Sequence, residues 1–251
     1  MMWIILSMLS SLVFAQVSGE AILTSNFIWR GTTFTNNKPA VQADVNYQFP
    51  YEHYLGVFAS NAEFSDPAMG AATEVNQEVD VYFSKRITRG DWEANFSYAY
   101  FTFGNAWFFN TDEWNFKLVY KSWELELSYM DDYFGYQGSY RYIKLGHEYE
   151  LSSSDTLRAY LGYNHFANRK GSTKERCLNS GCSESAYSLS GAASSHYIDG
   201  YLGLRRKIQE QLSLELAYNY TNRDEYIFDG SSIEREDAQD SVFFITMIHE
   251  F

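Results

Sequence analysis

The sequence predicts a transmembrane, antiparallel, up-and-down β-barrel of about twelve strands. Three observations predict it. Apolar and polar residues alternate in segments of about ten residues, the connections between these segments are alternately short and long, and aromatic residues gather at the segment ends. The composition agrees, because 21 Tyr and 19 Phe with only 3 Pro suit extended strands.

Hydropathy and charge exclude other classes of protein. The mean hydropathy is −0.36, and no stretch after residue 17 approaches the roughly 18 apolar residues that a spanning helix needs. A barrel tolerates this mean because only every second residue of a strand meets lipid. The net charge of −13 argues against nucleic-acid partners and against a basic patch for anionic lipids.

The first fifteen residues resemble a signal peptide. An apolar core is followed by Val13-x-Ala15, which predicts cleavage after Ala15 and a barrel domain over 16–251. The pattern departs from the usual one because no Lys or Arg precedes the apolar core. The alternative is a short membrane anchor, for which the apolar run is too short.

The alternation is clearest in the segment from Val41. Val41, Val45 and Phe49 share one face, whereas Asp44 and Asn46 share the other. Successive side chains of a strand point to opposite faces, so each such segment has one apolar and one polar face. The pattern predicts strands at 21–30, 40–49, 54–62, 75–86, 92–103, 113–121, 123–130, 140–151, 156–166, 196–208, 212–222 and 242–251.

The connections alternate in length along the chain. This predicts short periplasmic turns, long external loops and both termini in the periplasm, whereas a soluble sandwich has no reason to sort its loops in this way. The short ones are 50–53, 87–91, 122, 152–155 and 209–211; the long ones are 31–39, 63–74, 104–112, 131–139, 167–195 and 223–241.

Aromatic residues at strand ends favour a membrane barrel over a soluble sandwich, because amphipathic rings form girdles at the two interfaces. The last predicted strand closes on Phe251, on one face with Phe243, Ile245 and Met247, and resembles the recognition signal of the barrel-assembly machinery. His249 departs from that signal. The predicted girdle comprises Trp29, Phe49, Tyr54, Trp92, Tyr100, Trp114, Tyr120, Trp123, Tyr129, Tyr201 and Tyr220.

Several blocks of sequence carry a family resemblance. They are TSNFIWRGTT at 24–33, PAVQ at 39–42, YLGVFASN at 54–61, EVDVY at 78–82 and SYMDDYFG at 128–135. Together they resemble the Gcw_chp family of proteobacterial outer-membrane proteins, also called TorF-type porins, through about residue 165. The resemblance implies an outer-membrane location and a channel role, without a substrate. The Cys-bearing loop is not expected from the family pattern.

The polar strand faces collect charges of both signs, with acids in excess. One interpretation is a passive pore for small polar solutes with a weak cation preference; the other is a lumen plugged by paired charges. We expect outer-membrane lipid, lipopolysaccharide and the assembly machinery as partners, and no cofactor. The lumen candidates are Arg30, Asp44, Glu78, Asp80, Glu93, Lys117, Glu124, Glu126, Lys144, Glu148, Glu150, Arg158, Asp199, Arg205, Lys207 and Glu215.

Four local features allow two interpretations each. Arg30 either protrudes into the pore or pairs with a carboxylate of another strand, and pairing is favoured. Asp131 and Asp132 could hold a divalent cation, although a solvated pair that begins an external loop is favoured. Cys177 and Cys182 are expected to form a small disulfide rather than a metal site. The acidic loop 223–241 is expected to be solvated, or to bridge to lipopolysaccharide through divalent cations.

An outer-membrane enzyme is the rival class. Barrel lipid hydrolases resemble one another in a His-x-Ser pair on one strand, and none of the five histidines has Ser two positions on. The Asp-x-His of omptin-type proteases is also absent from the sequence. We therefore predict no catalytic residues and no enzymatic activity, and we expect His147 and His165 on the lipid-facing side.

Overall fold

The computed structural model describes residues 16–64, 75–134, 136–167, 196–222 and 241–251. The described chain is almost entirely β-structure, and none of its segments is a helix of the length and hydropathy needed to cross a bilayer. The barrel strands are β1 (Gln16–Thr24), β4 (Ala40–Phe49), β5 (His53–Phe64), β6 (Val75–Arg89), β7 (Trp92–Phe103), β8 (Thr111–Tyr120), β9 (Trp123–Tyr133), β10 (Tyr136–Glu150), β11 (Asp155–Ala167), β12 (His196–Gln209), β13 (Leu212–Thr221) and β14 (Ser241–Glu250).

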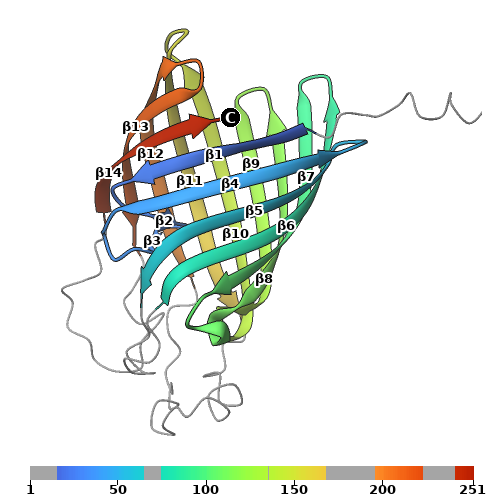
Figure 1. Ribbon diagram of the computed structural model, residues 1–251, viewed down its shortest axis with the longest axis vertical. Helices are drawn as coiled ribbons and strands as arrows, with labels where there is room; N and C mark the ends of the chain where they lie inside the picture. The colour runs from blue at the N-terminus through green and yellow to red at the C-terminus, as the bar shows by residue number, and fades with distance from the viewer. Residues whose placement is uncertain (1–15, 65–74, 135, 168–195, 223–240) are drawn as a thin grey trace, which may run out of the picture.

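These twelve strands of the described chain form one closed antiparallel barrel (Figure 1). Each strand pairs with its neighbours in sequence, and the barrel closes where β1 pairs with β14 on one side and with β4 on the other. Gly19 and Phe251 extend this closing seam by exchanging two backbone hydrogen bonds, of 3.0 and 2.9 Å. The predicted fold class and the strand count are confirmed.

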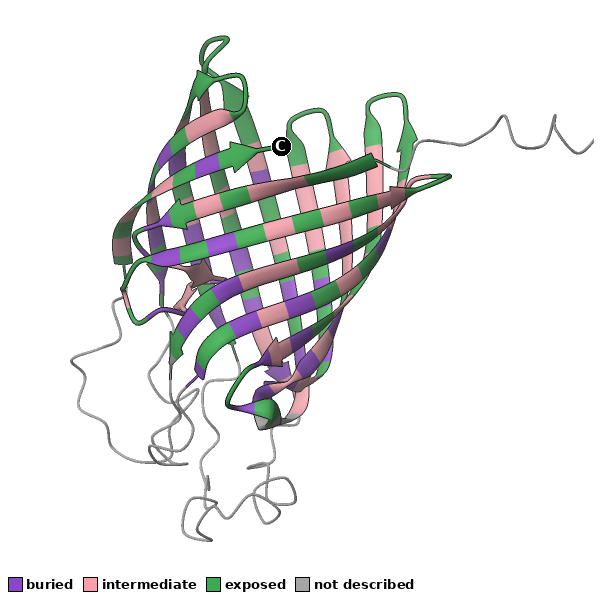
Figure 2. Ribbon diagram, viewed as in Figure 1, coloured by how far each residue is buried: buried purple, intermediate pink, exposed green. Residues whose placement is uncertain are grey.

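The two faces of each strand differ as the alternation predicts. Bands of exposed and covered residues alternate along the strands in Figure 2. On β14, Phe243, Ile245 and Met247 lie on the outer face, whereas Phe244 and Thr246 on the inner face are partly covered. The apolar outer surface suits contact with lipid.

The connections sort by length onto the two ends of the barrel. The short-turn end carries the connections 50–52, 90–91, 121–122, 151–154 and 210–211. In Figure 1 the β4–β5 turn lies at the right of this end and the other short turns lie at the top. The opposite, long-loop end carries the other connections, among them residues 104–110 with the 3-10 helix η3 (Trp107–Phe109). Which end faces the periplasm stays a prediction.

The first strand differs from its prediction. We expected a strand at 21–30 and an external loop at 31–39, but β1 ends at Thr24, where its hydroxyl bonds to the carbonyl oxygen of Asn26 at 2.8 Å. Residues 25–39, here called the inward segment, then fold into the barrel and form the hairpin of β2 (Ile28–Trp29) and β3 (Thr32–Thr33).

A two-residue turn explains why the inward segment forms a hairpin. Arg30 and Gly31 occupy it with φ of 48° and 77°, and the type I′ turns that suit hairpins need positive φ at both central residues. The alternation in the predicted strand at 21–30 is therefore real, but it belongs to the end of β1 and to β2, which a bend separates. Periodicity alone could not place this bend.

The predicted loop 131–139 is also corrected. β9 runs to Tyr133 and β10 begins at Tyr136, so most of this stretch is strand. Asp131 and Asp132 are consecutive residues of β9, and their side chains point to opposite faces of the sheet. The two carboxylates therefore do not converge on one cation. Asp131 is exposed and accepts a hydrogen bond of 2.5 Å from the hydroxyl of Tyr129.

The predicted aromatic girdle holds for most of its members, with three exceptions. Trp29 lies on the inward segment rather than on the barrel wall. Tyr54 and Tyr201 face the lumen, where Tyr54 contacts Arg86 and Tyr201 stacks on Tyr160. The outward members are exposed on the surface: Phe49, Trp92, Tyr100, Trp114, Tyr120, Trp123, Tyr129 and Tyr220.

Three predictions fall outside the described residues. They are the signal peptide at 1–15, the disulfide between Cys177 and Cys182, and the acidic side chains of the loop at 223–241. Of that loop the structure describes only Ser241, the first residue of β14.

Gly31 provides a test of the inward segment. A Cβ atom there would lie 2.8 Å from Cβ of Asp199 and 3.0 Å from Oγ1 of Thr221, in addition to the cost of the positive φ. We expect Gly31→Ala to lower the free energy of unfolding by about 1–3 kcal/mol. It should also speed hydrogen exchange in residues 25–39, as measured by mass spectrometry on the refolded barrel.

Gly90 is the matched control. Its φ is +61°, but an added Cβ would meet nothing within 4 Å. Gly90→Ala should therefore cost less and leave exchange at 25–39 unchanged. Equal effects of the two substitutions would contradict tight packing of Gly31 against the barrel wall.

Candidate functional site

The lumen wall is the candidate functional site. The strand-borne charges predicted for the lumen all lie at inner-face positions, in alternation with outward-facing side chains. Arg30 also lies in the lumen, but it comes from the inward segment. The strand-borne set is Asp44, Glu78, Asp80, Glu93, Lys117, Glu124, Glu126, Lys144, Glu148, Glu150, Arg158, Asp199, Arg205, Lys207 and Glu215.

The inward segment is held in shape by its own polar side chains. Asn26 accepts a hydrogen bond of 2.6 Å from Thr33 through Oδ1 and donates one of 2.8 Å to Asn37 through Nδ2. The hydroxyl of Thr35 bonds to the carbonyl oxygen of Lys38 at 2.7 Å. These contacts close the bend and aim its Arg30–Gly31 tip across the lumen.

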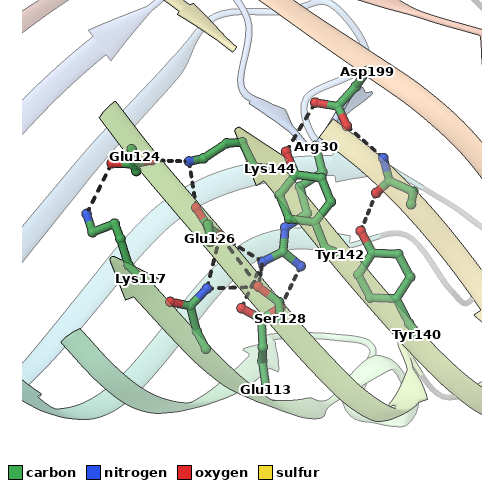
Figure 3. A network of polar contacts seen from close by, with 12 residues as sticks. Arg30, Glu113, Lys117, Glu124, Glu126, Ser128, Tyr140, Tyr142, Lys144 and Asp199 are labelled. Carbon is green, nitrogen blue, oxygen red and sulfur yellow. Dashed lines mark hydrogen bonds and ion pairs between the residues drawn. The ribbon is translucent and has the colours of Figure 1, made fainter. Parts of the chain in front are cut away.

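Arg30 fastens the tip of the inward segment to β8 and β9 (Figure 3). Its guanidinium donates two hydrogen bonds to Glu113, of 2.5 and 2.9 Å, and one of 2.6 Å to Ser128. A further contact of 3.3 Å reaches Glu126. The side chains of Arg30 and Glu113 are only 6% and 7% exposed, so this is a buried, bidentate ion pair.

Aromatic rings surround the same guanidinium. It lies over the rings of Trp29 and Tyr142, at 4.3 and 4.4 Å from their centroids, and 5.6 Å from that of Tyr140. Arg suits such a site because its planar cation stacks on rings and still donates in its own plane. Tyr197 holds the other side of the turn by donating to the carbonyl oxygen of Arg30 at 2.9 Å.

The inward segment therefore reaches across much of the lumen. Its contacts run from β5, where the carbonyl oxygen of Phe34 accepts a hydrogen bond of 2.7 Å from Glu63, to Tyr197 on β12. Phe34 and Trp29 pack into a buried aromatic cluster near the long-loop end. The other large rings of the cluster are Phe101, Phe103, Phe109, Tyr133, Phe134, Tyr140, Tyr142, Phe166 and Tyr197.

Two ion-pair networks lie closer to the short-turn end. In the first, Lys144 bonds to Glu124 at 2.7 Å and to Glu126 at 2.5 Å, and Lys117 approaches Glu124 at 3.7 Å (Figure 3). Glu126 joins this network to Arg30. A chain of ion pairs thus runs from the inward segment toward the short-turn end.

Glu215 is the centre of the second network. It accepts hydrogen bonds of 2.7 Å from Arg205 and 3.3 Å from Arg158, and a third from the hydroxyl of Tyr201. Arg158 also donates to Glu148 at 2.7 Å. The sequence predicted that these charged side chains share the inner face of the barrel, but not which of them form ion pairs with one another.

The remaining predicted residues lie apart from these networks. Asp44 accepts hydrogen bonds from the hydroxyl of Tyr82, at 2.7 and 2.9 Å. Asp199 accepts a hydrogen bond of 2.6 Å from Asn164 and faces Tyr142 at 3.3 Å. Glu78 and Asp80 lie together on β6 and form no ion pair with another described residue.

Sequence reasoning missed Glu113, although the signal for it was present. Glu113, Asn115 and Lys117 alternate with Trp114 and Phe116, so period two places Glu113 on the lumen face. Placing Arg30 against it required knowledge of the inward turn.

Along the network that joins Lys117 to Arg30, the exposure of the basic side chains falls toward the inward segment. The side chain of Lys117 is 40% exposed and that of Lys144 18%, whereas Arg30 is almost covered. Figure 2 shows the same trend, with buried positions gathered toward the long-loop end. The inner face is thus polar, and the inward segment covers its charges around Arg30.

A Ser–His pair on the outer face bears on the enzyme alternative. The hydroxyl of Ser122 lies 3.0 Å from Nε2 of His147, at the short-turn end. Chain spacing could not reveal this pair, because its members come from the β8–β9 turn and from β10. Within the described chain, no carboxylate bonds to Nδ1 of His147, so the third group of a hydrolytic triad is not seen there.

The closed antiparallel barrel with a charged inner face is the fold of solved outer-membrane porins. Two solved porins share the fold. KdgM porin is 9% identical with a TM-score of 0.53, over 93% of this chain and 99% of that chain. NanC porin is 10% identical with a TM-score of 0.53, over 93% and 98%. No curated protein matches the sequence.

Residues 13–176 match the family model described as "Bacterial protein of unknown function (Gcw_chp)". The chain belongs to this family, as the sequence blocks predicted.

The Arg30–Glu113 pair yields a stability prediction. Arg30→Met leaves the Glu113 carboxylate buried without its cation, which should lower the free energy of unfolding by about 3–5 kcal/mol. Adding Glu113→Gln should recover part of the loss because it removes the stranded charge. The measurement is denaturant unfolding of the refolded barrel.

Arg206→Met is the control. Arg206 forms an ion pair of 2.7 Å with Asp155 at the short-turn end, but its side chain is 62% exposed. Water screens this pair, so its loss should matter far less. A similar loss from both substitutions would show that Arg30 does not act as a buried pair.

Proposed function

We propose that the chain forms an outer-membrane channel that passes small polar solutes passively, with a weak preference for cations. The observation that carries the proposal is the graded lumen. Charged side chains of both signs line a vestibule that opens toward the short turns, and the inward segment narrows it. Fixed charges along a narrow path act as a filter for polar solutes.

The inward segment is the proposed constriction. Side chains of Arg30, Trp29 and Phe34 contact β8 and β7. The carbonyl oxygens of Phe34 and Arg30 accept hydrogen bonds from β5 and β12. Such a constriction limits the channel to small solutes. Because β2 and β3 form a sheet of their own outside the closed strand ladder, the segment can be altered without opening the barrel wall.

Unpaired acids support the cation preference. Glu20 and Asp44 lie on the inner faces of β1 and β4, and within the described residues neither of them forms an ion pair with Lys, Arg or His. Lys144, Arg158 and Arg205, by contrast, are paired with carboxylates. The uncompensated charge of the lumen wall is therefore negative, which attracts cations.

The proposal includes the setting of the barrel. The apolar outer face contacts outer-membrane lipid, the short turns face the periplasm, and the long loops meet lipopolysaccharide. Export by the signal peptide at 1–15 and insertion by the barrel-assembly machinery precede folding. The Cys177–Cys182 disulfide pins an external loop.

A permanently closed barrel, with a structural or interaction role, is the second candidate. The observation that favours it is the burial of Arg30 and Glu113 among aromatic rings, which makes the constriction tight. In the closed barrel no solute passes the inward segment, whereas in the channel small solutes do.

Conductance separates the two candidates. In planar bilayers the refolded protein should give small, reproducible steps. Replacing residues 27–35 with a Gly/Ser linker of the same length should enlarge the steps several-fold, because Trp29, Arg30 and Phe34 leave the lumen. A silent wild type beside a conducting variant would establish the closed barrel. Silence of both, with folding verified by heat-modified gel mobility, would refute the channel.

The reversal potential in a KCl gradient tests the cation preference. The wild type should favour K⁺, and Glu20→Gln with Asp44→Asn should reduce that preference because two lumen charges are lost. Asp91→Asn is the control, since its side chain lies at the 90–91 turn and is 63% exposed. An unchanged reversal potential in the double variant would disprove the role of these acids.

A further inference from the structure

Two acids on β6 stand out from the other lumen charges. Glu78 and Asp80 are two positions apart on one strand, so both point inward. The strand register places Glu78 opposite Ser60 of β5, which in turn lies opposite Gln42 of β4. Side chains directly opposite across strands have Cβ atoms about 5 Å apart. Four oxygen-bearing side chains from three neighbouring strands therefore share one patch of the wall.

All four side chains are buried. Glu78 is 2% exposed, and Asp80, Ser60 and Gln42 are 5–7% exposed. Oε2 of Glu78 and Oδ1 of Asp80 are covered and have no hydrogen-bond partner. Buried polar atoms nearly always have a partner, because an unpaired one costs free energy. Two orphaned carboxylate oxygens in one patch therefore indicate a missing positive ligand.

The patch has no positive side chain of its own. Among the described residues, neither Glu78 nor Asp80 forms an ion pair with Lys, Arg or His. Two desolvated carboxylates that interact with each other cannot both stay charged on their own. Either the two groups share a proton, which neutralises one of them, or a metal cation lies between them. The choice between these two depends on the surrounding groups.

The surroundings favour a metal cation. Carboxylates with neutral hydroxyl and amide oxygens are the ligands that hard divalent cations take, and Ca²⁺ tolerates mixed sets of them. Asp44 lies in the same register row as Asp80, through Phe58, and Glu20 lies opposite Asp44. Glu20 and Asp44 are only partly buried, so they form an acidic track that leads a cation from the vestibule to the patch.

We propose that Glu78 and Asp80, with Ser60 and Gln42, form a binding site for a hard divalent cation such as Ca²⁺ inside the barrel wall. The site holds fewer than three carboxylate or imidazole ligands, so neutral oxygens complete it. A bound ion would neutralise the buried acids and tie β6 to β5 and β4 beside the inward segment. This binding goes beyond the proposed channel and does not require that solutes pass.

Terbium luminescence tests the site with the full-length refolded chain in detergent. Tb³⁺ replaces Ca²⁺ in oxygen-rich sites and emits when nearby aromatic rings, such as Tyr82 on the same face of β6, are excited. The wild type should show saturable emission that excess Ca²⁺ displaces. Glu78→Gln with Asp80→Asn should weaken this binding at least tenfold. Ser60→Ala, which keeps both acids, should weaken it by a smaller factor.

Asp131→Asn with Asp132→Asn is the matched control, because it removes two adjacent acids from β9 without touching the patch. It should bind like the wild type. Identical titrations of the wild type and the Glu78/Asp80 variant would overturn the site and leave a shared proton between the acids. If that variant does not fold, an unchanged affinity in Ser60→Ala and in Gln42→Leu overturns it instead. Bilayer conductance is not part of the readout, so the site and the channel can fail separately.

Discussion

The structure depends on closing the backbone hydrogen-bond ladder between its first and last strands. In an apolar surrounding every peptide group needs a partner, and only a closed sheet supplies one to all of its strands. β1 meets β14 through Glu20–Thr24, and Gly19 with Phe251 extends the seam. Once the sheet is closed, one face of every strand must turn outward and the other must fill or line the lumen.

The lumen is filled from within the chain at one end. Twelve strands enclose more space than strand side chains fill, and the inward segment occupies part of it. Its buried cation at Arg30 demands a buried acid, which Glu113 supplies, and the aromatic rings around them keep water out. The side chains of Lys117 and Glu148 nearer the short turns stay exposed to water, so one wall carries both buried and hydrated charges.

Much of the fold was predictable because period two is a local property. Val41 to Phe49 alternate without interruption, and β4 has the predicted bounds. The lumen face of Lys117, Lys144 and Glu126 followed from the same rule. The prediction for the first strand was wrong because the alternation continues from Thr24 to Ile28 and Trp29 across a bend. That bend depends on the contact between Asn26 and Thr33, which the alternation does not reveal.

By itself, the sequence determined the barrel, its strand count and the polarity of its two faces, since these depend on neighbours along the chain. The tertiary structure decided which charges meet. Arg30 and Glu113 are 83 positions apart. They pair because Arg30 lies in the turn between β2 and β3, which directs its side chain across the lumen to β8. The position of Glu78 and Asp80 was decided in the same way, since closure brings no Lys, Arg or His of the described residues into an ion pair with them.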